Sequence, residues 1–158
     1  MRSSHVLSAY SARAEEYAAA LGRMAATAEA DRELIARWAR GCRGRIVDAG
    51  CGPGHWTAYL HDLGLEVEGV DPVERFVKIA REQHPHVTYR QGSFAGLPAG
   101  SYGAVLAWYS LIHLPPQNLS ETLASLRDSL MPQGDLLVGF FAGDRIEEFP
   151  HAVAPAYY

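Results

Sequence analysis

The sequence has little lysine, little cysteine and no long hydrophobic run. Lys78 is the single lysine among 14 basic residues. The longest apolar stretches, residues 104–109 and 136–142, are much shorter than the ~20 residues of a membrane helix. No basic segment followed by an apolar one opens the chain. We therefore expect neither a secretory signal nor a membrane partner.

The two cysteines, Cys42 and Cys51, are too few for a disulfide framework, and no Cys/His spacing matches a zinc motif. We therefore expect no bound metal and a reduced, cytoplasmic setting. The net charge is −4, and acids outnumber bases in residues 46–158. This acidic balance argues against a nucleic-acid partner.

Strand and helix patterns alternate along most of the chain. Two helices are expected first, over residues 8–21 and 24–40. Short apolar strands then alternate with helices, which predicts a single α/β domain with a parallel sheet and helices on both faces. The expected strands are 45–49, 66–70, 87–91, 104–109 and 135–141, with a turn at 132–134 before the last strand. The expected helices are 55–63, 71–84 and 118–131. Pro72 would take the first position of the second of these helices, and Asn118 and Glu121 would form a capping box at the start of the third.

The strongest local signal is the Gly-Cys-Gly-Pro-Gly turn at residues 50–54, which follows the first strand. Glycines allow a sharp turn and a close approach of a ligand to the backbone. Asp71 ends the second strand, 21 residues after Gly50, where a nucleotide-binding βαβ unit carries its ribose-binding acid. A carboxylate there accepts hydrogen bonds from both ribose hydroxyls. The alternative for Asp71 is a plain helix N-cap.

The turn does not match the common nucleotide fingerprints. A dinucleotide site needs Gly or Ala at the position occupied by His55, and no Gly-Lys-Ser/Thr of a P-loop follows. Asp48, directly before the turn, would repel a pyrophosphate but suits a ligand with an ammonium group. S-adenosylmethionine carries an ammonium and a sulfonium, so it fits this loop better.

Residues 44–142 resemble the class I S-adenosylmethionine-dependent methyltransferases, through the segment 47–54 and Asp71. The resemblance implies a Rossmann-like, doubly wound, mostly parallel sheet with an N-terminal helical cap (1–43), a cofactor-binding core (44–142) and a tail (143–158). The segment 9–17 resembles the cap helix of the small-molecule branch. By this resemblance the cofactor-binding residues are Tyr17, Asp48, Ala49, Gly50, Gly52, Gly54, Thr57, Asp71, Pro72, Ser93, Phe94, Trp108 and Tyr109.

The resemblance also assigns roles within that set. The main chain at 49–52 would line the methionine part, Asp71 would hold the ribose, Ser93 and Phe94 would border the adenine, and residues 108–109 would lie under the cofactor. Tyr17 would reach its carboxylate end. Thr57 either bonds the amino-acid end of the cofactor or serves only the helix start.

The sequence departs from the family at three places. Ser93 stands where an acid often accepts from the adenine amino group, and Gly103 stands where Asp is common. The fold normally adds an antiparallel strand hairpin after the fifth strand, and we expect this hairpin to be missing here. The sheet edge would then be bare or would pair with a second copy, and both arrangements stay open.

These observations predict an S-adenosylmethionine-dependent methyltransferase that acts on a small molecule by in-line displacement at the sulfonium methyl, with S-adenosylhomocysteine as product. His113, just after the fourth strand, is either a general base or a packing residue. A nicotinamide-dependent oxidoreductase and a non-catalytic nucleotide-binding module are the alternatives.

Overall fold

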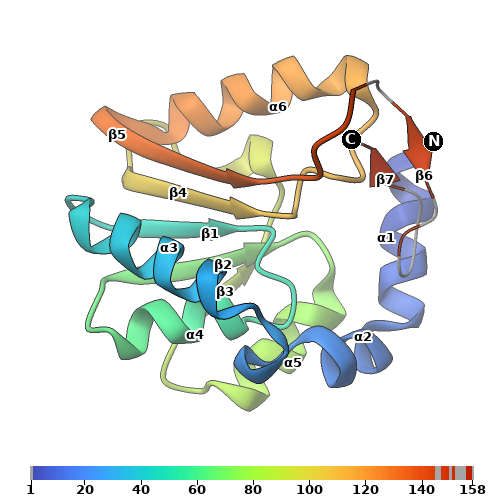
Figure 1. The fold of residues 1–158 in the computed structure, drawn as a ribbon, viewed down its shortest axis with the longest axis horizontal. Helices are drawn as coiled ribbons and strands as arrows, with labels where there is room; N and C mark the ends of the chain where they lie inside the picture. Colours follow the sequence, from blue (N-terminus) through green and yellow to red (C-terminus); the bar gives the residue numbers. More distant parts are fainter. Residues whose placement is uncertain (1, 145–146, 150, 152–155, 158) are drawn as a thin grey trace.

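The fold is built on one parallel five-stranded sheet in a computed structural model that describes residues 2–144, 147–149, 151 and 156–157. The strand order is β3-β2-β1-β4-β5, and every neighbouring pair is parallel (Figure 1). This order reverses direction at β1 and confirms the doubly wound α/β fold. The strands are β1 Ile46–Ala49, β2 Val67–Asp71, β3 Thr88–Gln91, β4 Tyr102–Trp108 and β5 Leu130–Gly139.

Helices cover both faces of the sheet, α3 to α5 on one side and α6 on the other (Figure 1). Successive side chains of a strand point to opposite faces. In β1, Ile46 packs with Ile35 of α3 and Leu60 of α4. Its neighbour Val47 packs with Leu126 of α6. The helices are α3 Glu29–Gly41, α4 His55–Asp62, α5 Glu74–Gln83 and α6 Pro116–Ser129, with a 3₁₀ turn η2 at Phe94–Gly96.

Two further helices, α1 (Arg2–Ala12) and α2 (Ala14–Leu21), lie beside the carboxyl ends of the strands (Figure 1). Ala14 and Ala18 of α2 are buried against Phe76 and Ile79 of α5. Burial of these apolar side chains holds the two helices beside the carboxyl ends of the strands.

The expected single helix over 8–21 is wrong, because the helix breaks at Arg13. Arg13 has φ −117° and ψ 18°, and no glycine or proline marks the break. The expected helix over 24–40 also divides, into a 3₁₀ turn η1 at Met24–Ala26 and α3 from Glu29. Between them the Thr27 hydroxyl and the Arg32 guanidinium donate to the Met24 carbonyl at 2.7 and 3.2 Å, which replaces continued helix bonding.

Two predicted helix starts are also wrong. Helix α5 begins at Glu74 and not at Pro72, because the Asp71 carboxylate accepts the Val73 N–H and holds the turn extended. Helix α6 begins at Pro116, and Asn118 makes no capping bond. A proline in the first turn needs no cap for its missing N–H.

The last strand differs from its expected limits of 135–141. Strand β5 already begins at Leu130, which pairs with Tyr102, and the pairing resumes at Asp135 opposite Ala104. The expected turn at 132–134 is therefore an irregularity inside the strand, with Gln133 at φ 63°.

No described strand pairs with the outer edge of β5; the short strands β6 (Glu148–Phe149) and β7 (Ala156–Tyr157) pair only with each other. Within the part of the chain that the structure describes, no helix is long and apolar enough to cross a membrane.

Candidate functional site

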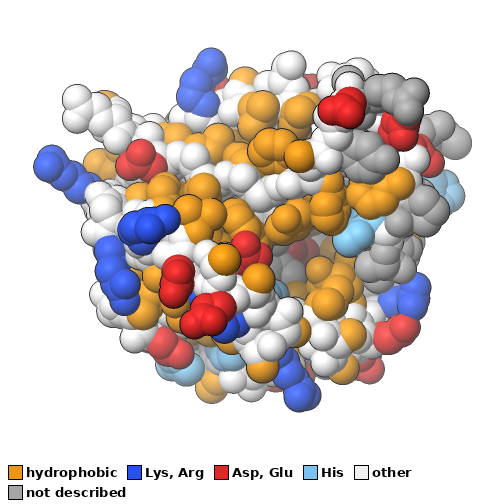
Figure 2. Space-filling view, viewed as in Figure 1, with side chains coloured by type: hydrophobic (Ala, Val, Ile, Leu, Met, Phe, Trp, Pro, Cys, Tyr) orange, Lys and Arg blue, Asp and Glu red, His pale blue; other side chains and the backbone are white. Residues whose placement is uncertain are grey.

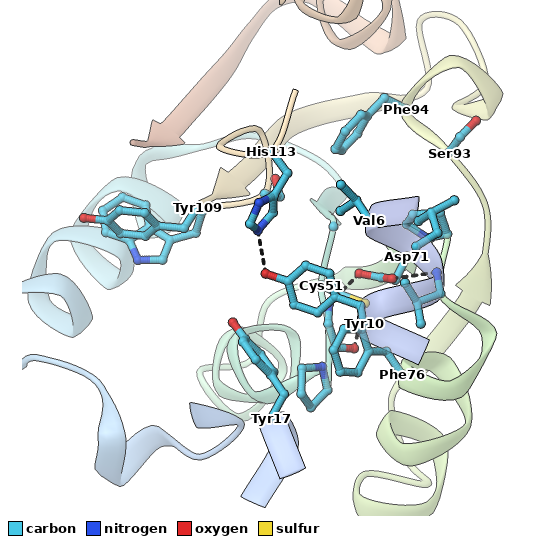
Figure 3. A pocket seen from close by; sticks show the side chains of 18 of the residues that line it. Val6, Tyr10, Tyr17, Cys51, Asp71, Phe76, Ser93, Phe94, Tyr109 and His113 are labelled. Carbon is cyan, nitrogen blue, oxygen red and sulfur yellow. Dashed lines mark hydrogen bonds between the residues drawn. The ribbon is translucent and has the colours of Figure 1, made fainter. Parts of the chain in front are cut away.

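The carboxyl ends of β1, β2 and β4 open into one cavity of about 310 Å³, within the range of small-molecule pockets. Helix α1 and the start of α5 close it from the other side (Figure 3). Hydrophobic side chains gather around the hollow in the molecular surface (Figure 2). It is lined by Val6, Leu7, Tyr10, Tyr17, Gly50, Cys51, Gly52, Pro53, His55, Asp71, Pro72, Val73, Phe76, Ser93, Phe94, Trp108, Tyr109, Ser110, His113 and Leu114.

The Gly-rich turn forms the floor of the cavity. Gly50, Gly52 and Gly54 have φ of 80°, 52° and 86°, which side-chain-bearing residues rarely adopt. The Gly50 N–H donates to the Val70 carbonyl at 2.7 Å, and the Tyr89 hydroxyl donates to the Gly54 carbonyl at 2.8 Å. The turn is therefore tied to β2 and β3.

Asp71 joins the turn to helix α5. One carboxylate oxygen accepts the Gly52 N–H at 2.8 Å, and the other accepts the Val73 N–H at 2.8 Å. The side chain is nearly buried, and burial raises the pKa of Asp71 to about 6. Each oxygen keeps further lone-pair capacity toward the cavity. The helix N-cap interpretation of Asp71 is wrong, because α5 has Val73 at its N-cap and no side-chain capping bond. Asp71 lines the cavity, and its contact with the ribose stays a prediction.

Asp48 and Thr57 lie beneath the turn and do not line the cavity. The Thr57 hydroxyl donates to the Asp48 carboxylate at 2.7 Å, and both side chains are fully or almost fully buried. Burial raises the pKa of Asp48 to about 7, although the Thr57 hydrogen bond opposes this rise. Ala49 and Gly54 also lie outside the lining, so direct cofactor contacts at these four residues stay predictions.

The other residues predicted to bind the cofactor all line this cavity. Ser93 and Phe94 follow β3, and Trp108 and Tyr109 lie at the end of β4 on the opposite side. The Trp108 and Tyr109 rings meet edge-on with centroids 5.5 Å apart. Tyr109 adopts φ 53° and is 38% exposed, at the mouth.

His113 also lines the cavity, and its Nε2 lies 2.5 Å from the Tyr10 hydroxyl (Figure 3). Tyr10 also contacts the Tyr17 and Phe76 rings, at 5.5 and 5.7 Å between centroids. Burial raises the pKa of Tyr10, so its hydroxyl stays protonated beside the imidazole. The tyrosine thus fixes the orientation of the imidazole.

Several lining residues escaped the sequence interpretation. Val6, Leu7 and Tyr10 come from α1, whose approach to the cavity depends on the unpredicted break at Arg13. His55 is largely buried, and burial lowers its pKa to about 4, so it is neutral near pH 7. The position of His55 directly after the Gly-rich turn could have identified it as a cavity residue. No local sequence signal identifies Val6 or Leu7 as cavity residues.

The family of methyltransferase domains matches residues 46–134, more than half of the chain. The chain belongs to this family. The matched segment runs from β1 into β5 and contains Gly52 and Asp71. The family match, the relatives and the structural neighbours confirm the expected class I S-adenosylmethionine-dependent methyltransferase family.

The relatives with specific names include two different O-methyltransferases. The methyltransferase is 32% identical over 108 residues to malonyl-(acyl-carrier protein) O-methyltransferase of Enterobacter lignolyticus, which covers 68% of this chain and 43% of the relative. It is 35% identical over 102 residues to ubiquinone biosynthesis O-methyltransferase of Xanthomonas campestris, covering 60% of this chain and 41% of the relative. The chain thus spans less than half the length of these relatives.

Solved structures agree on the architecture. A TehB-like S-adenosylmethionine-dependent methyltransferase from Corynebacterium glutamicum matches with a TM-score of 0.71 and 25% identity, over 84% of this chain and 74% of the other. The DhpI–SAH complex matches with a TM-score of 0.71 over 96% of this chain and 76% of the other; at 24% identity it supports the fold alone.

Proposed function

We propose that the methyltransferase transfers the sulfonium methyl of S-adenosylmethionine to an oxygen atom of a small-molecule acceptor by in-line displacement. The observation that carries this proposal is the bond between Asp71 and the Gly52 N–H at 2.8 Å, inside a cavity at the carboxyl ends of the strands. The Asp71 carboxylate thus lies directly beside bare main chain, and it supports the proposal as the candidate ribose ligand.

The cavity residues suit the cofactor. Asp71 would accept the ribose hydroxyls with its remaining lone pairs. A side chain built on Gly52 would meet no protein atom within 4 Å, so open space lies beside this backbone for the methionine part. Phe94 and Ser93 would border the adenine. The bound cofactor supplies an activated methyl group, so the protein need not supply a nucleophile.

The protein contributes to the chemistry mainly through position and proton transfer. Alignment of an acceptor is worth up to ~7–11 kcal/mol in well-oriented systems. We assign proton removal to His113 and Tyr10: the Tyr10 hydroxyl takes the acceptor's proton as it passes its own to His113 Nε2, 2.5 Å away. A base of this kind contributes about 10²–10⁴-fold for a hydroxyl acceptor.

The acceptor class rests on two supports. Both named relatives are O-methyltransferases, which favours oxygen as the methylated atom. Most of the lining near α1 is apolar, including Val6, Leu7 and Leu114, so an acceptor with an apolar body fits there.

Calorimetric titration with S-adenosylhomocysteine tests the site. We expect Asp71→Ala to weaken binding by more than tenfold, because a hydrogen bond to a charged group is worth about 1.5–3 kcal/mol. Asp71→Asn, which keeps the shape and one acceptor oxygen, should also weaken binding. The exposed Asp128→Ala is the matched control and should bind as the parent does. A folded parent protein that binds neither the cofactor nor its product would contradict the proposal.

A further inference from the structure

A second cluster of ligand-type side chains lies away from the cavity. His61, Asp62 and His86 each offer one atom to a common point, and these atoms all lie within 4.8 Å of one another. Asp62 Oδ1 is 3.7 Å from His61 Nδ1 and 3.6 Å from His86 Nε2. The two imidazole rings meet at a steep angle, with centroids 5.1 Å apart.

The fold, and not the local sequence, creates this cluster. His61 and Asp62 end α4, which starts at the Gly-rich turn and runs back to the amino ends of the strands (Figure 1). His86 lies in the connection between α5 and β3, two residues before Thr88 opens the strand. The cluster therefore lies at the amino ends of the strands, whereas the cofactor cavity lies at their carboxyl ends. The carboxyl-terminal end of a helix also carries partial negative charge, which favours a cation.

The ligand atoms suit a transition-metal ion. Two imidazole nitrogens and one carboxylate oxygen form a set that Zn²⁺ accepts, with a fourth position left for water. Zinc–ligand bonds of about 2.0–2.1 Å in a tetrahedron put ligand atoms about 3.3 Å apart. The observed 3.6 and 3.7 Å need only a small inward movement of exposed or half-exposed side chains.

An independent observation points the same way. His61 Nδ1 is covered from solvent and has no hydrogen-bond partner among the described residues. A covered polar atom without a partner is unfavourable, and such an atom calls for a missing ligand. A metal ion between His61 and His86 would satisfy it.

We propose that His61, Asp62 and His86 bind one Zn²⁺ ion, which clips the end of α4 to the connection before β3. No metal was expected from the sequence because zinc motifs are recognised by short spacing, whereas His86 is far from His61 along the chain. The ion is structural and not catalytic, since it lies at the amino ends of the strands and Asp71 lies at their carboxyl ends.

The test is metal titration of the tag-free full chain after treatment with a chelator. We expect Zn²⁺ to bind at one equivalent with micromolar affinity and to raise the thermal unfolding midpoint. Co²⁺ should give visible d–d absorption typical of nitrogen and oxygen ligands. His86→Ala and Asp62→Asn should each weaken Zn²⁺ binding at least tenfold, with unchanged circular dichroism.

The control is His5→Ala, which removes an exposed histidine on α1 and should bind Zn²⁺ as the parent does. Two results would overturn the proposal. One is Zn²⁺ binding weaker than about 100 µM in the parent chain, at which the ion would add little stability. The other is tight binding that survives both His86→Ala and Asp62→Asn, which would place the ion elsewhere.

Discussion

Replacing Asp48 by Asn should stabilise the protein by an amount that grows as pH rises from mild acid to alkaline solution. Asp48 is 2% exposed, and its carboxylate accepts a hydrogen bond from the Thr57 hydroxyl at 2.7 Å. An asparagine at this position would keep an oxygen acceptor for that hydroxyl while removing a charge that is costly to bury.

The magnitude follows from the pKa of Asp48, which burial raises from 3.8 to about 7. The folded protein therefore keeps this proton over a pH range in which the unfolded chain has released it. The free energy of unfolding must fall as pH rises from about 4 through 7. At 1.36 kcal/mol per pKa unit the full cost is about 4 kcal/mol, and structural relaxation reduces it. Asp71, whose pKa is raised to about 6, adds a slope of the same sign.

Urea unfolding followed by circular dichroism at pH 5, 6, 7 and 8 measures this cost. Asp48→Asn should exceed the parent by about 1–2 kcal/mol at pH 5 and by about 4 kcal/mol at pH 8, with unchanged m values. Asp128→Asn, at an exposed carboxylate, should run parallel to the parent across the range. A stability difference for Asp48→Asn that is the same at pH 5 and pH 8 would refute the reasoning.

Gly52→Ala and Tyr10→Phe probe the cavity, and Gly64→Ala, outside it, is the control for the first. Gly52→Ala and Gly64→Ala both force an alanine to positive φ, with no protein atom within 4 Å of the new methyl group. Each variant should therefore lose about 1–2 kcal/mol of unfolding free energy, measured in urea. Calorimetry should show lost affinity for S-adenosylhomocysteine only for Gly52→Ala. Equal affinities for the two variants would show that the cofactor does not approach Gly52. Tyr10→Phe removes the bond to His113 and should lower kcat by ten- to a hundredfold on an acceptor found by panel screening, with KM nearly unchanged. An unchanged kcat would remove both residues from proton transfer.

The parallel sheet was predictable because its signals are local. The buried strands are short apolar runs such as residues 104–107, and the Gly-rich turn with Asp71 marks the edge where ligands bind. Asp71 and Gly52, both expected from the sequence to bind the cofactor, are joined by a hydrogen bond of 2.8 Å.

The missed features depend on contacts between distant residues. Tyr10 and His113 are 103 positions apart, and only the packing of α1 over the strand ends brings them together. No glycine or proline marks the break at Arg13. The position of α2 is instead fixed by its packing against Phe76, which is distant in the sequence. The capping-box spacing at Asn118 misled because Pro115 and Pro116 already start the helix two residues earlier.

The two hydrogen bonds of Asp71 determine at which step the loop loses its conformational entropy. Because its two oxygens already immobilise the amides of Gly52 and Val73, the glycines lose their freedom during folding and not when a ligand arrives. Under the proposed function, the nucleoside part of the cofactor would meet a loop that is already ordered and would lose little affinity to loop ordering. The stability of the loop and the proposed contact with the ribose therefore depend on the same carboxylate.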